Sequence, residues 1–318
     1  PLFDATVVGD GCKVFKVPYS LVRDSHKAAA EEAADRAEQK AIEAACPRLS
    51  ELNQRQTLGV GAFGRVKLVT GYPRVVKGEQ PAAPVKVRRF SARPKPVNEV
   101  DAATGEERGE MRSYALKILS KAHIVASKQA DSTIRERDIL RALKHPFILR
   151  LHTTYQTSHA CYFLLELVPG GELFGRLAKM PAGQISDSEA RFYAACTVEA
   201  LQHMHSRDIV YRDLKPENLL IDARGYIKVV DFGFAKKVLT GITHTVCLTP
   251  EYVSPEMALG KGYFKDVDYW AFGVLVYEMV CGYTPFSGGG ADVNLMSVCR
   301  ENVAGKVDYP PVMQPLTK

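Results

Sequence analysis

The stretch Tyr211-Arg212-Asp213-Leu214-Lys215-Pro216-Glu217-Asn218 is followed, after two short apolar runs, by Asp231-Phe232-Gly233. The apolar runs, residues 219–221 and 226–230, flank Asp222-Ala223-Arg224-Gly225 and predict a β-hairpin. A hairpin brings its two ends together, so four side chains are expected to meet in one small volume: Asp213, Lys215, Asn218 and Asp231. Two carboxylates, one ammonium group and one amide oxygen suit a metal-bound polyphosphate.

A glycine-rich segment, Leu58-Gly59-Val60-Gly61-Ala62-Phe63-Gly64-Arg65-Val66, lies earlier in the chain with strand-like residues on both sides. No long helix follows it, although a dinucleotide-binding fold would require one. Glycines have no Cβ, so the backbone N–H groups of a hairpin can approach phosphates closely. The expected partner is a lysine on the next strand, and Lys117 stands in the strand-like run Tyr114-Ala115-Leu116-Lys117-Ile118-Leu119.

Residues 71–112 separate the glycine-rich segment from Lys117 and contain five prolines and many charges without any period. This composition predicts a polar insertion in a loop that joins two strands. The segment Arg88-Arg89-Phe90-Ser91 lies inside the insertion.

Helical spacing of Ile134, Ile139, Leu140 and Leu143 predicts a helix over residues 131–144, which also carries Glu136. Further along, residues 162–168 are typical of a buried strand. Ser186 and Glu189 predict a capping box ahead of a helix that ends near residue 205. Two more helices are expected, an apolar one over residues 266–282 and one after residue 287.

The first fifty residues differ in composition from the rest. Residues 1–23 alternate like short strands, and residues 26–45 are rich in alanine with mixed charge. Alanine favours a helix, and Pro47 ends it. Because this helix has few large apolar residues, it is expected to be a solvent-exposed connector.

The composition is ordinary for a globular protein: 46% of the 318 residues are hydrophobic, 25% are charged, and the net charge is +6. No basic run lies among periodic aromatic residues, so a nucleic-acid partner is not expected. The seven scattered cysteines favour a reducing compartment, which indicates a cytoplasmic location. No apolar stretch is long enough to span a membrane.

Residues 52–318 resemble a protein kinase of the AGC group. The resemblance rests on Tyr211 before Arg212-Asp213, on Asp231-Phe232-Gly233-Phe234-Ala235-Lys236 and on Thr249-Pro250-Glu251-Tyr252. Within that group the chain looks most like the cGMP-dependent kinases, through residues 57–61, 121–125 and 191–196. The implied fold is α+β and bilobal, with a small antiparallel β-sheet lobe and a larger, mainly α-helical lobe.

The resemblance also implies a division of the chain. Residues 1–24 would be the remnant of an upstream cyclic-nucleotide-binding domain, and residues 25–51 a helical linker. The small lobe would cover residues 52–165, with the insertion at 71–112. The large lobe would cover residues 166–318 and be incomplete, because Glu256 is expected to pair with an arginine beyond Lys318.

Roles for the gathered residues follow from the resemblance and from the needs of phosphoryl transfer. Asp213 would accept the proton of the substrate hydroxyl, and Lys215 would neutralise the transferring group. Lys117, paired with Glu136, would hold the α- and β-phosphates of ATP, while Asn218 and Asp231 would hold Mg²⁺. The implied nucleotide-binding set is Leu58, Gly59, Val60, Gly61, Ala62, Phe63, Gly64, Arg65, Val66, Ala115, Lys117, Leu165, Glu166, Val168 and Glu172.

Substrate recognition is assigned on the same basis to an acidic patch made of Glu172, Glu217 and Glu278. Carboxylates pair with guanidinium groups, so the predicted substrates are proteins with arginine before a serine or threonine. For Glu278 the alternative is a buried partner within its helix. Thr245 corresponds to the activation-loop phosphorylation site, and its phosphate would pair with Arg212. Ser91 is predicted to be autophosphorylated, although a merely basic solvated loop is the alternative there.

The first hypothesis is an active serine/threonine kinase that uses MgATP and is activated by cGMP bound to the upstream domain. One alternative is a cAMP-dependent type of kinase, and another is a pseudokinase or scaffold that binds nucleotide without turnover. A homodimer through regions upstream of Pro1 is also implied. One residue departs from the family pattern: Leu248 stands where glycine is usual, and a branched residue adopts a positive φ only at a cost.

Overall fold

The computed structural model of the chain describes residues 33–61, 64–74, 110–238, 243, 249–286 and 295–310. It also describes the backbone of two short antiparallel strands, β1 (Asp4–Val8) and β2 (Cys12–Lys16). Among the residues with a predicted role or a departure from the family pattern, those outside these ranges are Ala62, Phe63, Ser91, Thr245 and Leu248.

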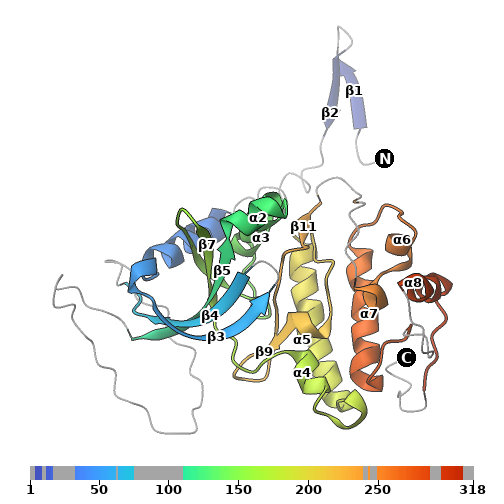
Figure 1. Ribbon diagram of the computed structural model, residues 1–318. Coiled ribbons are helices and arrows are strands. Elements are labelled where there is room, and N and C mark those ends of the chain that lie inside the picture. Colours follow the sequence, from blue (N-terminus) through green and yellow to red (C-terminus); the bar gives the residue numbers. More distant parts are fainter. Residues whose placement is uncertain are drawn as a thin grey trace, which may run out of the picture.

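One five-stranded antiparallel sheet forms the smaller part of the molecule, in the order β3-β4-β5-β7-β6 (Figure 1). Two helices, α2 (Lys121–Ala126) and α3 (Ala130–Ala142), follow β5 in the chain. The strands are β3 (Asn53–Gly61), β4 (Gly64–Gly71), β5 (Arg112–Ser120), β6 (Leu151–Gln156) and β7 (Ala160–Glu166).

Burial across this sheet follows the composition of its strands. The central strands β5 and β7 bury Leu116 and Leu164 completely, whereas every residue of the edge strand β3 is exposed. Gly71 at the end of β4 pairs with Arg112 at the start of β5. The predicted insertion at 71–112 therefore joins two neighbouring strands, as expected.

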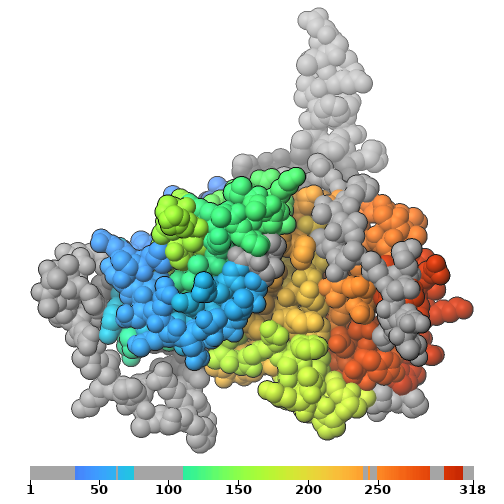
Figure 2. Space-filling model, viewed as in Figure 1, coloured from blue at the N-terminus to red at the C-terminus, as the bar shows by residue number. Residues whose placement is uncertain are grey.

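The larger part is mainly helical and lies beside the sheet (Figures 1 and 2). Its core is formed where α5 (Asp187–His205) packs against α7 (Asp266–Cys281), with Leu201, Met204 and Leu275 fully buried. The shorter helices are α4 (Leu173–Leu177), α6 (Pro255–Ala258) and α8 (Leu295–Ala304). Two-stranded pairs join β8 (Ile209–Val210) to β11 (Lys236–Lys237) and β9 (Leu219–Ile221) to β10 (Ile227–Val229). This arrangement confirms the predicted α+β fold.

Four 3₁₀ turns complete the described elements: η1 (Leu49–Glu51), η2 (Pro181–Gly183), η3 (Pro216–Asn218) and η4 (Pro250–Tyr252).

Two local predictions were wrong in part. Ser186 caps α5 by accepting from the N–H of Glu189, but the Glu189 carboxylate turns away to bind Arg176 (2.5 Å) and the hydroxyl of Tyr193 (2.9 Å). A guanidinium partner is a stronger ligand for a carboxylate than a backbone N–H, so only half of the capping box forms. Ile134 was placed on the apolar face of α3, yet it is 49% exposed.

The helix over residues 33–45 is mostly exposed, as its composition predicts, but polar side chains also fasten it to the rest of the molecule. The buried amide of Gln39 donates to the carbonyl oxygens of Leu151 (3.3 Å) and His152 (3.1 Å). Ion pairs extend along the helix: Glu43 with Arg141 (3.2 Å), Glu38 with Lys144 (3.2 Å), and Asp35 with Arg207 (3.4 Å). The low apolar content limits hydrophobic burial, but it does not prevent polar anchoring.

Candidate active site

The β9–β10 hairpin forms as predicted and closes the candidate site. Gly225 has a φ of +90° in its turn, a conformation that favours glycine, and Ile227 pairs with Ile221. At the open end the N–H of Val230 donates to the carbonyl oxygen of Asn218 (3.0 Å). This bond fixes Asp231 next to the segment that carries Asp213, Lys215 and Asn218.

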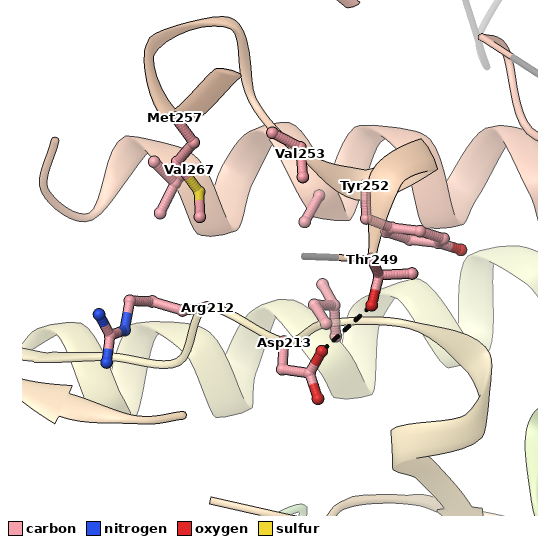
Figure 3. Close-up of a pocket in the computed structure, with 9 residues that line it drawn as sticks. Arg212, Asp213, Thr249, Tyr252, Val253, Met257 and Val267 are labelled. Carbon is pink, nitrogen blue, oxygen red and sulfur yellow. Dashed lines mark hydrogen bonds between the residues drawn. The ribbon is translucent and has the colours of Figure 1, made fainter. Parts of the chain in front are cut away.

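Asp213 lies at the centre of a set of short polar contacts. Its carboxylate accepts from Nζ of Lys215 (2.9 Å), from Nδ2 of Asn218 (2.6 Å) and from Oγ1 of Thr249 (3.4 Å; Figure 3). Burial raises the pKa of Asp213, the nearby charge of Asp231 adds to that rise, and the bonds from Lys215 and Asn218 oppose it. The result is a carboxylate that accepts a proton more readily than a free aspartate does.

Asp268, on α7, holds the backbone of this loop, and it was not among the predicted site residues. It is fully buried and accepts the N–H groups of Tyr211 (2.8 Å) and Arg212 (2.7 Å), as well as a bond with Nε2 of His205 (2.7 Å). Arg212 has a φ of +70°, and Asp268 stabilises that strained conformation. The available indication in the sequence was an aspartate next to the apolar residues of the predicted buried helix, which also carries Asp266 and Glu278.

Phe232 anchors the second part of the site. It is fully buried and meets the ring of Tyr211 edge-on, with centroids 5.4 Å apart. The Tyr211 hydroxyl donates to the carbonyl oxygen of Val230 (2.5 Å). Asp231, between these two anchored neighbours, has a φ of +54°, and its exposed carboxylate accepts only the N–H of Gly233 (3.2 Å) among the hydrogen bonds of the described residues.

Lys117 and Glu136 form the ion pair that the resemblance implies, with Nζ and Oε1 2.6 Å apart. Burial acts to lower the pKa of Lys117, but the charges of Glu136 and Asp231 outweigh it and the pKa is raised. Lys117 therefore stays protonated between two carboxylates that come from different parts of the fold. Ser132 of α3 also donates to the carbonyl oxygen of Gly233 (3.0 Å), which ties α3 to this segment.

The predicted nucleotide-binding residues are only partly gathered. Gly61 pairs with Gly64 at the end of the β3–β4 hairpin, and any Cβ on Gly64 would lie 1.8 Å from the carbonyl oxygen of Ile118. Val66 lies opposite Lys117 in the sheet. The residues that share one hydrophobic cluster are Val66, Ala115, Leu165 and Val168. The remaining described members are more exposed: Leu58 is 45% and Val60 83% exposed, Gly59 and Arg65 lie on the exposed hairpin, and Glu172 is on the surface.

Glu166, a member of the implied nucleotide-binding set, also takes part in the fold through its side chain. Its carboxylate binds Nζ of Lys228 (2.8 Å) and accepts the N–H of Arg150 (2.7 Å). The bond to Lys228 ties the end of β7 to β10, and the bond from Arg150 ties it to the residue before β6.

The donor atoms at the site suit a magnesium-bound nucleotide. Nδ2 of Asn218 donates to Asp213, which leaves the amide oxygen of Asn218 as a ligand beside the Asp231 carboxylate. Magnesium prefers such oxygens and keeps several waters. No group of three or more His, Cys, Asp or Glu side chains within the described residues could hold a metal. Phosphate and water oxygens would therefore have to complete the coordination.

The acidic residues assigned to the substrate differ in their surroundings. Glu172 and Glu217 are exposed, and Glu172 is joined to Leu220 through a backbone bridge. Burial raises the pKa of Glu278, and the charges of Glu217 and Glu251 add to that rise. The hydroxyl of Tyr252 donates to Glu278. Glu251 and the buried Tyr252 therefore adjoin Glu278, although the sequence indicated them only as part of a family motif.

Beside Asp213 lies a cavity of about 20 Å³, room for about one water molecule. It is lined by the loop residues Arg212 and Asp213 and by Thr249, Tyr252 and Met257, which come from the following segment (Figure 3). In this view the side chains of Arg212 and Asp213 point apart, so the arginine faces away from the Thr249 contact. Arg212 instead binds the carbonyl oxygen of Phe234 (2.7 Å).

Comparison with known proteins agrees with this geometry. Residues 100–313 match the protein kinase domain, and the chain belongs to the protein kinase family, in the AGC group. It is 39% identical over 267 residues to the cAMP-dependent protein kinase type 3 of Saccharomyces cerevisiae, covering 84% of this chain and 56% of that protein.

Cyclic-GMP-dependent kinases are equally similar. The chain is 39% identical over 262 residues to the cGMP-dependent protein kinase of Plasmodium berghei, covering 82% of this chain and 26% of that protein. It is 40% identical over 241 residues to the cGMP-dependent protein kinase, isozyme 1, of Drosophila melanogaster, covering 76% and 27%. The chain thus spans about half of the length of its curated relatives or less.

None of the helices in the described ranges has the length and apolarity needed to cross a membrane.

Proposed function

We propose that the protein is a serine/threonine kinase that transfers the γ-phosphate of MgATP to proteins carrying arginine before the acceptor residue. The observation that carries this proposal is the junction of two units around Asp231. One unit is Asp213 with Lys215 and Asn218, and the other is the ion pair of Lys117 with Glu136. The charge of Asp231 reaches both units, since it raises the pKa of Asp213 and of Lys117.

Phosphoryl transfer requires mainly positioning and charge neutralisation. Asp213 accepts the proton of the substrate hydroxyl while the hydroxyl oxygen bonds to the γ-phosphorus and the bond to the ADP oxygen breaks. Lys215 offsets the charge on the transferring group, and Lys117 holds the α- and β-phosphates. Magnesium, held by Asn218 and Asp231, would neutralise phosphate charge. Thr249 bonds both Asp213 and Lys215 (3.1 Å) and keeps them in register.

Substrate choice is assigned to the surface formed by Glu172, Glu217 and Glu278, with Glu251 beside them. Carboxylates bind guanidinium groups bidentately, so arginine side chains are the expected ligands. The hydrogen bond from Tyr252 orients the carboxylate of Glu278, and this bond supports the assignment.

Regulation forms the remaining part of the proposal. Residues 1–24 are assigned to an upstream cyclic-nucleotide domain, 25–51 to a linker, and 52–165 and 166–318 to the two lobes. We assign cGMP as the activator, with cAMP as the competing candidate because relatives of both names match equally well. The proposal also includes phosphorylation of Thr245 and autophosphorylation of Ser91. It further includes a homodimer through upstream regions and a cytoplasmic location.

The test is phosphate transfer from γ-labelled ATP with Mg²⁺ to a serine peptide that carries two arginines, against the same peptide with citrulline in their place. The proposal expects transfer to the arginine peptide at least about tenfold faster. Equal rates would refute arginine recognition, and no transfer by the natural full-length protein would refute kinase activity. Adding cGMP or cAMP to that full-length protein separates the two activators, and mass spectrometry after incubation with MgATP tests Ser91.

A further inference from the structure

A second cavity, of about 540 Å³, lies away from the Asp213 site. Its walls come from the helix over residues 33–45, from α3, and from the β8–β11 pair. Figure 1 places α3 and β11 side by side, and the two elements are in contact. The volume is within the range of sites that hold small molecules.

The floor of this cavity is apolar. It is formed by Ile134, Ile139 and Ala142 of α3 and by Ile209 of β8. Ile134 is 49% exposed, which explains why its position on α3 did not match the expected core face. An exposed isoleucine over a concave surface gives a ligand apolar area to cover.

The rim of the cavity is cationic. Basic side chains exceed acidic ones by three, and the charged residues are Arg36, Arg135, Arg141, Arg207, Lys236 and Lys237 against Asp35, Asp131 and Asp138. Some of these charges already have partners, such as Arg207 with Asp35 and Lys236 with Thr243. Arg135 lines the cavity, and its side chain has no hydrogen bond or ion pair within the described residues. Its Nε is enclosed by protein, so the terminal guanidinium nitrogens are the atoms that a ligand can reach.

We propose that this cavity binds a small amphipathic anion, with a phosphate group at Arg135 and an apolar or aromatic part over Ile134 and Ile139. Charge-assisted bonds to a guanidinium are among the stronger polar contacts, and the cationic rim favours an anion over a neutral ligand. The site is separate from the nucleotide-binding residues, so both ligands bind at once.

Occupancy of this cavity bears on the ion pair of the active site. Arg135 directly precedes Glu136 on α3, and β11 begins three residues after Gly233. A ligand that contacts α3, β11 and the 33–45 helix together stabilises the position of α3 in which Glu136 meets Lys117. The site therefore couples an anionic small molecule to the phosphate-holding lysine.

The test is isothermal titration calorimetry of phenyl phosphate into the phosphatase-treated chain, with the nucleotide site saturated by adenylyl imidodiphosphate and Mg²⁺. Benzyl alcohol is the neutral comparison. We expect binding of phenyl phosphate that Arg135→Gln weakens about tenfold, the loss of one charge-assisted bond. Ile134→Ser should also weaken it, and Arg135→Lys should restore part of it. The control Arg191→Gln, an exposed arginine on α5 that pairs with Asp187, should leave it unchanged.

Three results would overturn the proposal. One is an absence of binding up to about 10 mM, which corresponds to less than 3 kcal/mol. Another is equal affinity in the native chain and in Arg135→Gln. The third is equal affinity for phenyl phosphate and benzyl alcohol. Far-ultraviolet circular dichroism of each variant shows whether it is folded, and Ile134→Ser gives an independent answer because its side chain is half-exposed.

Discussion

The loop at residues 211–218, which we propose to be catalytic, and the helix over residues 33–45 are held in place by opposite means. In the loop, a buried carboxylate on α7 accepts backbone N–H groups at 2.7 and 2.8 Å, so the attachment is short, buried and specific. The helix is attached by the Gln39 amide and by ion pairs whose carboxylates remain 25–56% exposed. Exposed pairs contribute under about 1 kcal/mol each.

This difference predicts where substitutions matter. Changes under the loop should cost much stability and all activity, because buried hydrogen-bond donors are left without acceptors. Changes along the helix should be small one at a time. The helix nevertheless contacts α3 through Glu43 and the large lobe through Asp35, so it links two parts that hold the active site.

Asp268→Ala should give the largest effect. It leaves two buried backbone N–H groups and His205 without their acceptor, and each such group costs about 1–3 kcal/mol, so we expect the free energy of unfolding to fall by about 3–5 kcal/mol. Chemical denaturation measures this. The control is Asp266→Ala, an exposed carboxylate in the first turn of the same helix, expected to cost below about 1 kcal/mol. Similar losses in both variants would contradict the assigned support of the loop.

Glu136→Gln should weaken catalysis with little loss of stability. Lys117 keeps a hydrogen-bond partner but loses the negative charge that offsets the effect of burial on its pKa. Its position relative to the ATP phosphates is then less firmly fixed. We expect kcat/KM for ATP to fall about 100-fold, the size typical of one electrostatic contact in a transition state. Asp138→Asn, an exposed carboxylate on the same helix, should change kcat/KM less than twofold. A native kcat/KM in Glu136→Gln would show that the ion pair of Lys117 with Glu136 is not needed for catalysis.

The pH profile tests the environment of Asp213. Its pKa is raised by burial, so kcat should fall with decreasing pH at a higher pH than an ordinary aspartate allows. Lys215 lowers that pKa, and Lys215→Met should therefore move the acid limb to still higher pH while reducing kcat. Steady-state rates from pH 5 to 8 measure the shift, and Lys179→Met, an exposed lysine after α4, is the control. An acid limb that moves to lower pH would contradict the assigned contact.

Gln39→Ala should have the smallest effect in this series. The variant leaves the carbonyl oxygens of Leu151 and His152 without the amide donor, which costs about 1 kcal/mol. Thermal unfolding measures this, with Lys40→Ala, an exposed neighbour, as the control expected to show no change. Equal melting temperatures for both variants would show that Gln39 does not stabilise the docking of the helix.

The elements with strong local patterns could be predicted from the sequence. The hairpin with Gly225 brought Asp231 beside Asn218, because a turn and two apolar runs determine that geometry locally. Asp268 was missed because its bonds to Tyr211 and Arg212 join residues more than fifty positions apart. Ile134 was wrongly assigned to the core, because helical spacing identifies the apolar face of a helix but not how much of that face is covered by other elements.

The docking of the 33–45 helix was missed for a related reason. Its anchors are polar, and the acceptors for Gln39 are backbone carbonyl oxygens of β6, which have no sequence pattern at all. Glu251 and Tyr252 were recognised only as part of a motif, since their proximity to Glu278 depends on how α7 packs against η4.

The most direct test of the account is a single-turnover measurement of γ-phosphate transfer by the native chain and by Asp213→Asn. Affinity for MgATP is measured on both proteins by calorimetry. Asparagine preserves the shape but cannot accept the proton, so the account predicts nearly equal nucleotide affinity and transfer slowed by about 100- to 10,000-fold. Transfer at an unchanged rate in Asp213→Asn would contradict the central role assigned to Asp213.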